Sequence, residues 1–178
     1  MIWAKIRNNN EDWAVYHKDL NGGTNPEQYR LTLNNLTAEV SSSTAWASKA
    51  PTSTHFFIGN DADTNGTNDQ YIYMLFASVA GISKVGSYSG QGFGQSQTIT
   101  TGFQPRFILA KSTSVSSWYM YDTTRGWGSG EDKRLELNQA QPQAQTQDVG
   151  APTSTGFTVN GGRSISQSGQ TFIYYAHS

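Results

Sequence analysis

The segment 61–69 carries the clearest pattern of metal-ligating side chains in the chain. Oxygen-bearing groups recur there at Asp61, Asp63, Asn65 and Asp69. Calcium prefers such oxygen ligands at alternate positions of a loop. An EF-hand would need a bidentate acid where Ile72 stands, and the loop at the corresponding place in the second half of the chain (160–169) has no carboxylate. We therefore predict a turn closed by its own Asx side chains, with no metal and no other cofactor.

Tryptophan side chains are candidates for ligand contact, because an aromatic face matches the C–H face of a sugar ring. The five tryptophans are Trp3, Trp13, Trp46, Trp118 and Trp127. Trp46 and Trp127 stand in segments rich in Ser and Gly and are therefore the candidates for exposed ligand contacts, although a loop tryptophan more often covers the edge of a core. Trp13 and Trp118 belong to strand-like runs, and we expect both in the core.

Residues typical of catalytic sites form no recognisable arrangement. The chain has no cysteine, and its histidines are His17, His55 and His177. The serine in segment 86–90 is displaced from the nucleophile-elbow position, and the glycines of 90–94 lack dinucleotide-loop spacing. Asp122 and Arg125 predict an ion pair at the end of a strand. We expect no enzyme activity, although two glycosidase carboxylates could still converge from separate loops.

The composition restricts the possible classes of function. The 178 residues carry a net charge of -1 and only 14% charged residues, so no basic face for nucleic acid is expected. No apolar run is long enough to span a membrane. Ser, Thr, Asn and Gln replace the usual charges, and aromatic residues reach 12%. This combination is typical of a β-protein whose exposed strand faces carry hydroxyl groups.

Five sequence blocks recur in the same order, about a hundred residues apart. The pairs are 2–5 and 108–111, 13–16 and 118–121, 31–34 and 135–138, 50–54 and 151–155, and 71–74 and 172–175. Such self-similarity indicates repeated structural units. We predict a first repeat at 1–80 and a second at 81–178.

Short alternating runs with turn residues between them predict strands. The expected fold is all-β, with antiparallel β-sandwiches built from two tandem copies of one repeat. Strands are expected at 56–58 and 157–159, and 27–36 favours a strand over a helix. The runs 84–88 and 97–99 have no counterpart in the first copy, whose front strands are therefore missing. Either a partner chain supplies those strands or the chain is part of a longer one, which we favour.

Several of these segments together resemble a known family. They are 85–90, 102–111, Trp118, 121–126, 50–53, Phe56, Gly59, 65–66 and 71–77. They are similar to the paired repeats of tail-fibre or adhesin-like structural proteins of marine tailed bacteriophages, cyanophages among them. The resemblance implies a duplicated unit that often follows a concanavalin-like or laminin-G-like sandwich. It implies no catalysis. In that family, the segment equivalent to residues 1–5 is usually preceded by a further strand. This chain departs from that pattern.

The resemblance and the composition together predict a non-enzymatic structural protein of the virion surface, a tail-fibre or adhesin module that contributes to host attachment. The alternatives are a capsid decoration protein, and a carbohydrate-binding module or glycan-cleaving tail spike. The expected partners are other virion proteins and a host cell-surface glycan, with no nucleic acid and no membrane insertion. Because exposed strand edges need partners, we expect a homo-oligomer, with a trimer favoured, assembled through 2–6 or 139–147.

Overall fold

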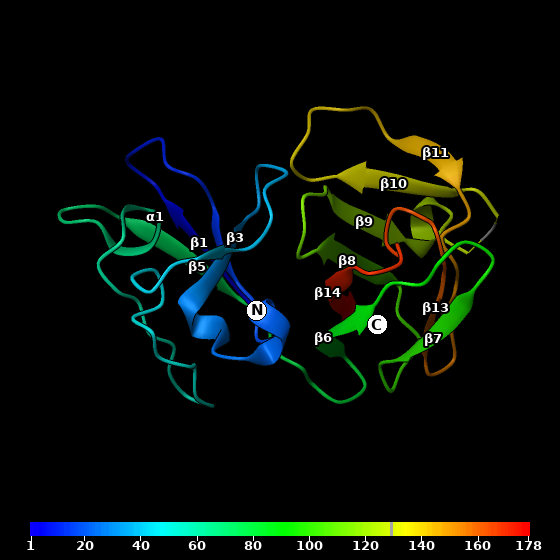
Figure 1. The fold of residues 1–178 in the computed structure, drawn as a ribbon, viewed down its shortest axis with the longest axis horizontal. Helices are drawn as coiled ribbons and strands as arrows, with labels where there is room; N and C mark the ends of the chain where they lie inside the picture. Colours follow the sequence, from blue (N-terminus) through cyan, green and yellow to red (C-terminus); the bar gives the residue numbers. More distant parts are fainter. Residues whose placement is uncertain (129) are drawn as a thin grey trace. The chain divides into compact units, whose positions relative to one another are not determined.

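The structure is a computed structural model that describes residues 1–128 and 130–178 (Figure 1). The side chains of residues 145 and 146 lie outside the described part. The chain divides into two compact units, Met1–Phe76 and Ala77–Ser178. This division falls within a few residues of the boundary expected between residues 80 and 81.

Both units are built from antiparallel strands. Strands make up 38% of the chain and helices 8%, which confirms the predicted all-β, sandwich-like class. Short strands joined by turns are what a sequence rich in Thr, Ser and aromatic residues favours.

The first unit contains one five-stranded sheet in the order β4-β3-β2-β1-β5. Its strands are β1 (Ile2–Ile6), β2 (Ala14–Tyr16), β3 (Tyr29–Thr32), β4 (Val40–Ser41) and β5 (Tyr71–Leu75). Its short helices are η1 (Leu20–Gly23), η2 (Pro26–Gln28) and α1 (Ala62–Asn65). The turn η2 therefore overlaps the beginning of the segment 27–36, where the sequence favours a strand, and β3 follows it.

The core of the first unit lies between this sheet and a long loop. Ile2 and Ala4 of β1 and Tyr16 of β2 point to the same face, because alternate residues of a strand share a face. Ala45 and Trp46 of the loop pack against them. Two stretches of this loop approach each other closely because residue 59 is glycine: a Cβ there would lie 1.9 Å from the Thr44 carbonyl oxygen.

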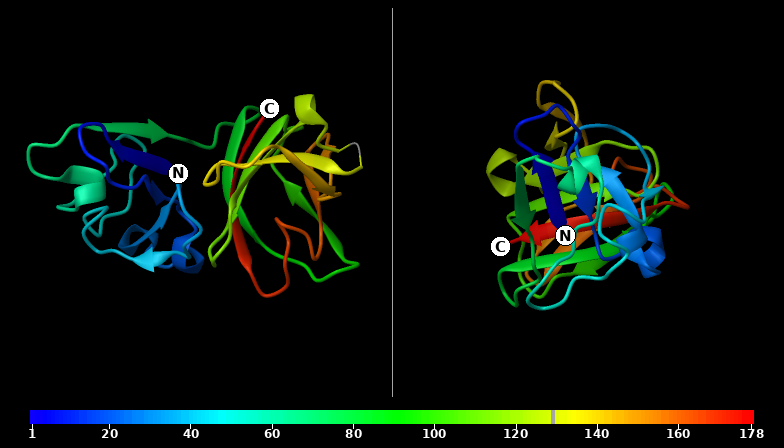
Figure 2. Two further views of the ribbon diagram at one scale, coloured as in Figure 1. Left: turned by 90° about the horizontal axis from the view of Figure 1, so that it is seen from above. Right: turned by 90° about the vertical axis from the view of Figure 1, so that its left-hand side faces the viewer.

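The second unit is a sandwich of two sheets (Figure 2). The six-stranded sheet has the order β11-β10-β9-β8-β14-β6, and the three-stranded sheet has the order β12-β13-β7. The strands of the first are β6 (Ser83–Ser89), β8 (Phe107–Ser112), β9 (Trp118–Asp122), β10 (Asp132–Glu136), β11 (Ala144–Gln147) and β14 (Thr171–His177). Those of the second are β7 (Ser96–Thr100), β12 (Pro152–Thr153) and β13 (Gly156–Asn160), and η3 (Thr123–Arg125) follows β9.

Inward-facing residues of both sheets form the core of this sandwich. The six-stranded sheet contributes Tyr88, Ile108, Ala110, Tyr121, Phe172, Tyr174 and Ala176. The three-stranded sheet contributes Ile99, Phe157 and Val159, and connecting segments add Phe103, Trp127, Val149 and Ile165. This core contains more buried side chains than the core of the first unit, because a second sheet closes it.

The two larger sheets have the same strand order and the same register. The order β4-β3-β2-β1-β5 corresponds to β11-β10-β9-β8-β14. Trp3 lies opposite Val15 and Met74, as Leu109 lies opposite Met120 and Tyr175. These pairs follow the offsets of the repeated sequence blocks. The duplication itself stays a prediction, which superposition of the two units tests.

The correspondence extends to a side chain beside the second strand. The backbone N–H of Trp13 donates to Asn34 Oδ1 at 2.9 Å, and the backbone N–H of Trp118 donates to Asn138 Oδ1 at 2.7 Å. Trp118 is buried, whereas Trp13 is half-buried and packs edge-on against Trp3. The core assignment is therefore right for Trp118 and only partly right for Trp13.

Two expectations about strands are wrong. Residues 56–58 form no strand, whereas β13 at the corresponding place of the second unit pairs with β7. A strand needs a ladder partner, and the first unit, all of whose residues are described, holds no counterpart of β7. The segment 2–6 is also not a free edge, because β1 pairs with β2 on one side and β5 on the other. By contrast, β11 is a border strand of its sheet.

Candidate functional site

The two tryptophans predicted to be exposed are buried. Trp46 is 1% exposed and Trp127 is 4% exposed. Trp46 packs against Tyr16 with ring centroids 5.8 Å apart, and Trp127 packs against Phe157 at 6.0 Å. Each ring is part of the core of its own unit. The prediction that these two rings are available to a ligand is therefore wrong.

In the segment 61–69, two carboxylates pair with a positively charged side chain of the protein, that of Arg30. Asp61 caps the first turn of α1 by accepting the Asp63 N–H at 3.0 Å. The Arg30 guanidinium forms ion pairs with the carboxylates of both residues. The two other candidate ligands, Asn65 and Asp69, belong to α1 and to the turn that follows it. A guanidinium between the two carboxylates takes the place that a calcium ion would need. Across the described residues, no group of three or more His, Cys, Asp or Glu side chains is arranged to hold a metal.

Asp122 and Arg125 form the predicted ion pair, with Arg125 Nε 2.9 Å from Asp122 Oδ2. Asp122 also accepts the backbone N–H of Arg125 at 2.9 Å and so caps η3. Capping and ion pairing both fix the chain where it leaves β9. The pair therefore has the structural role that its spacing indicates.

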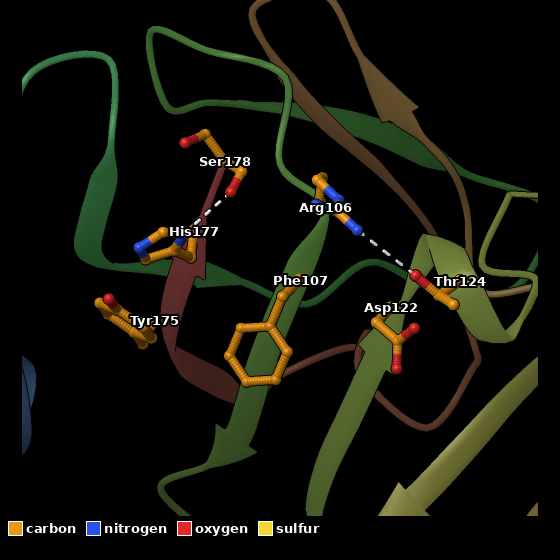
Figure 3. A pocket seen from close by; sticks show the side chains of 7 residues that line it. All are labelled: Arg106, Phe107, Asp122, Thr124, Tyr175, His177 and Ser178. Atoms are coloured by element: carbon orange, nitrogen blue, oxygen red, sulfur yellow. Dashed lines mark hydrogen bonds between the residues drawn. The ribbon is translucent and has the colours of Figure 1, made fainter.

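A hollow of about 530 Å³ lies beside this capped turn in the second unit (Figure 3). It is lined by Arg106, Phe107, Asp122, Thr124, Tyr175, His177 and Ser178. We call it the β8–β14 hollow. Phe107 lies opposite Asp122 of β9 and opposite His177 of β14, so the three side chains emerge side by side on one face.

Aromatic rings form one wall of the β8–β14 hollow. Phe107 and Tyr175 have ring centroids 6.3 Å apart, and so have Tyr175 and His177. His177 Nδ1 lies 2.8 Å from the Ser178 carbonyl oxygen, which orients the imidazole. A row of half-exposed rings can stack on the apolar face of a ligand.

Polar groups form the opposite wall. Arg106 donates to the Thr124 hydroxyl at 3.5 Å and keeps further N–H groups for an external acceptor (Figure 3). Asp122 is the one carboxylate side chain among the described residues that line the hollow, and Arg125 pairs with it. Rings on one wall and hydrogen-bond donors on the other are suited to binding a polyhydroxylated ligand.

A second hollow of about 300 Å³ lies between loops of the same unit. We call it the Phe93 hollow. Phe93 is 78% exposed and lies under the Arg163 guanidinium, 5.4 Å from its ring centroid. Asp148 Oδ1 accepts a hydrogen bond from Asn160 Nδ2 at 3.0 Å on the same rim. One exposed ring with one neighbouring arginine and one aspartate makes a smaller and more polar site than the β8–β14 hollow.

Sequence reasoning missed both hollows. The β8–β14 hollow depends on the register that brings Phe107 beside Tyr175 and His177, which periodicity alone does not supply. The Phe93 hollow had a local signal, because an aromatic residue flanked by glycines in segment 92–94 cannot be covered by its neighbours.

Two buried charged side chains lie outside the hollows. Lys111 Nζ donates to the carbonyl oxygens of Ser112 and Ser114, and burial lowers the pKa of this lysine from 10.5 to about 8. Asp132 accepts N–H groups of Gly128 and Val149, and burial raises the pKa of this carboxyl. Both side chains tie backbone segments together and serve structure.

Comparison with known proteins identifies the family of the chain but gives no function. No helix among the described residues is long and apolar enough to cross a membrane. Neither a curated protein nor a solved structure matches the chain. All residues from 1 to 178 match one family, described as a domain of unknown function, DUF7483. The chain is therefore a member of the DUF7483 family.

Proposed function

We propose that the chain is a non-enzymatic structural module of a bacteriophage virion, part of a tail fibre or adhesin that contributes to host attachment. The carrying observation is the recurrence of one sheet, in order and register, in both units. Two similar scaffolds in tandem place many loops and hollows on one molecule. Attachment proteins gain strength from many weak contacts in this way.

The β8–β14 hollow is the contact site in this proposal, and its ligand is a saccharide of the host surface. The rings of Phe107 and Tyr175 face the apolar side of a sugar ring, and Arg106 donates to its hydroxyl groups. Within the module the ligand is held and not cleaved, because a single neutralised carboxylate lines the hollow.

Localisation tests the structural part of the proposal. Antibodies against the chain, used for immunogold labelling of the phage particles that encode it, are expected to mark the tail fibres. Labelling over the whole capsid shell would show a decoration protein instead. The same particles reveal the partners, which we propose to be other virion proteins and further copies of the chain, with a trimer favoured.

Binding of bacterial surface oligosaccharides on a printed array tests the site. We expect Tyr175→Ala to weaken binding about tenfold, the effect of losing ~1.4 kcal/mol of stacking. Phe93→Ala removes an equally aromatic ring from the other hollow and is the matched control, which should bind like the unaltered chain. Loss of binding in Phe93→Ala alone would move the site to the Phe93 hollow. No binding to any oligosaccharide would refute the saccharide assignment.

A further inference from the structure

Strand β5 is a border strand of the first sheet, with a partner on one side only. It has no charged residue and no proline in the sequence from Tyr71 to Leu75. Three of its apolar side chains are exposed: Ile72 by 43%, Met74 by 38% and Leu75 by 62%. Border strands usually carry charges or prolines that prevent further pairing. This one has neither protection.

Unpaired backbone groups accompany these side chains. Met1 and Phe76 exchange two hydrogen bonds, at 3.0 and 2.9 Å, at the end of the β1–β5 ladder. Hydrogen-bonded and non-hydrogen-bonded pairs alternate along an antiparallel ladder. Three residues therefore direct their N–H and C=O groups away from β1: Tyr71, Tyr73 and Leu75.

The second unit shows how the corresponding edge is covered. There β14 takes the place of β5, and β6 pairs with its outer side. Gly86 of β6 lies opposite Tyr174, and a Cβ on residue 86 would come within 2.8 Å of the tyrosine hydroxyl and 2.9 Å of its ring. Tyr88, two residues later, lies opposite Phe172 and stacks on its ring at 5.6 Å. Glycine and an aromatic residue two positions apart thus fit this edge.

The same steric requirement is expected at the β5 edge. Tyr73 occupies the position of Tyr174, and Ala4 and Ala110 are their partners on the inner strands. Its ring packs against Phe56 at 5.2 Å, as the ring of Tyr174 packs against Phe157 at 5.4 Å. A strand added to β5 therefore needs a very small residue opposite Tyr73.

The need for a small residue opposite Tyr73 argues against β5 of a second copy as the added strand. In antiparallel pairing of two β5 edges, the residue opposite Tyr73 would be one of the outward-directed residues of that strand. All of these are large: Tyr71, Tyr73 or Leu75. None leaves the space that Gly86 leaves beneath Tyr174.

We propose that the open edge of β5 binds a segment of a neighbouring protein as an added antiparallel strand. The segment has the chemistry of β6, with glycine opposite Tyr73 and an aromatic residue opposite Tyr71. Main-chain hydrogen bonds supply affinity in this mode, and alternate side chains supply specificity. The exposed Ile72 and Met74 pack against the other face of the added segment.

A labelled peptide of residues 81–91, which contains the β6 sequence, tests this inference with the full chain. We expect saturable binding by fluorescence anisotropy. The same peptide with Gly86→Val is the control, and it should bind at least about tenfold more weakly because its side chain meets the tyrosine ring. Equal binding of the two peptides, or no binding of either, would overturn the proposal.

A pair of chain variants assigns the binding to β5. Leu75→Pro removes one outward N–H at an exposed position of a border strand, where proline is tolerated, whereas Leu75→Thr keeps it. We expect about tenfold weaker peptide binding for the proline variant and near-normal binding for threonine, with unchanged circular dichroism in both. Equal binding by both variants would show that the peptide binds elsewhere. A dimer in light scattering that Leu75→Pro converts to a monomer would show instead that a second copy fills the edge.

Discussion

Each unit contains a sheet with five strands in the same order, and the two units differ in what covers that sheet. In the first unit a loop that carries Trp46 covers the inner face, and β5 ends the sheet. In the second unit a three-stranded sheet covers the corresponding face, and β6 extends the sheet beyond β14. A sheet with this strand order can therefore pack against either a loop or a second sheet. The register of the sheet is set by its own side chains and not by the layer above it.

The difference also predicts unequal stability. Apolar burial contributes about 25 cal/mol per Å², and the sandwich buries more side chains than the loop-covered sheet. We expect the first unit to unfold more readily than the second.

The largest effect is expected from removing the loop tryptophan of each core. Trp46→Ala and Trp127→Ala should each cost ~3–5 kcal/mol, because both delete a buried indole and leave a cavity. We expect Trp46→Ala to unfold the first unit, whose core is small, and Trp127→Ala to weaken the second without unfolding it. Hydrogen exchange read by mass spectrometry resolves the two units. Equal loss of protection in both units for either variant would remove the contrast.

A second test uses the buried Lys111. Its pKa of about 8 in the folded chain lies below the ordinary value of 10.5. Between these values the unfolded chain binds the extra proton, so the free energy of unfolding should rise with pH across this window, by up to about 3 kcal/mol. Urea denaturation at several pH values measures the slope, which Lys111→Met should abolish. Lys5→Met, at the corresponding position of β1, is the control and should keep it. A slope that persists in Lys111→Met would belong to another group.

The paired asparagines give a smaller and more direct comparison. Asn138→Ala should lower the free energy of unfolding by ~1–2 kcal/mol, because it removes the acceptor of the backbone N–H of the buried Trp118. Asn34→Ala removes the same bond beside the half-buried Trp13, where water can replace it, and should cost less than 1 kcal/mol. Thermal denaturation of both variants measures the difference. A larger cost for Asn34 would contradict the assigned exposures.

The smallest effect is expected from a calcium chelator. Because the Arg30 guanidinium already pairs with both Asp61 and Asp63, removing calcium should leave the melting temperature unchanged. A bound ion would stabilise the fold by mass action and could not escape this measurement. A fall of several degrees that disappears in Asp61→Ala would show a calcium site in the first unit.

Strand positions were predictable where the sequence repeats itself. The blocks at 2–5 and 108–111 lie in β1 and β8, and the i,i+3 spacing of Asp122 and Arg125 was sufficient to predict their ion pair. These features depend on residues close together in the chain, or on a pattern present twice. Local information was enough in both cases.

Features that depend on long-range packing were not predictable. Residues 56–58 have the composition of a strand, but strand formation also needs a partner, and composition does not show one. Trp46 and Trp127 stand in polar segments, yet each folds back into a core. The β8–β14 hollow arises only when Phe107 lies beside both Asp122 and His177. Burial and neighbourhood in these cases are properties of the tertiary fold.

The constant register has a consequence for how such a sequence can evolve. Between β2 and β3 the chain forms η1 and η2, whereas between β9 and β10 it forms η3, yet the flanking strands pair residue for residue alike. Insertions and deletions in these connections therefore leave every cross-strand pair in place. Recombination between genes at equivalent strand positions would also preserve the sheet. The scaffold can thus remain constant while its connections diversify under selection.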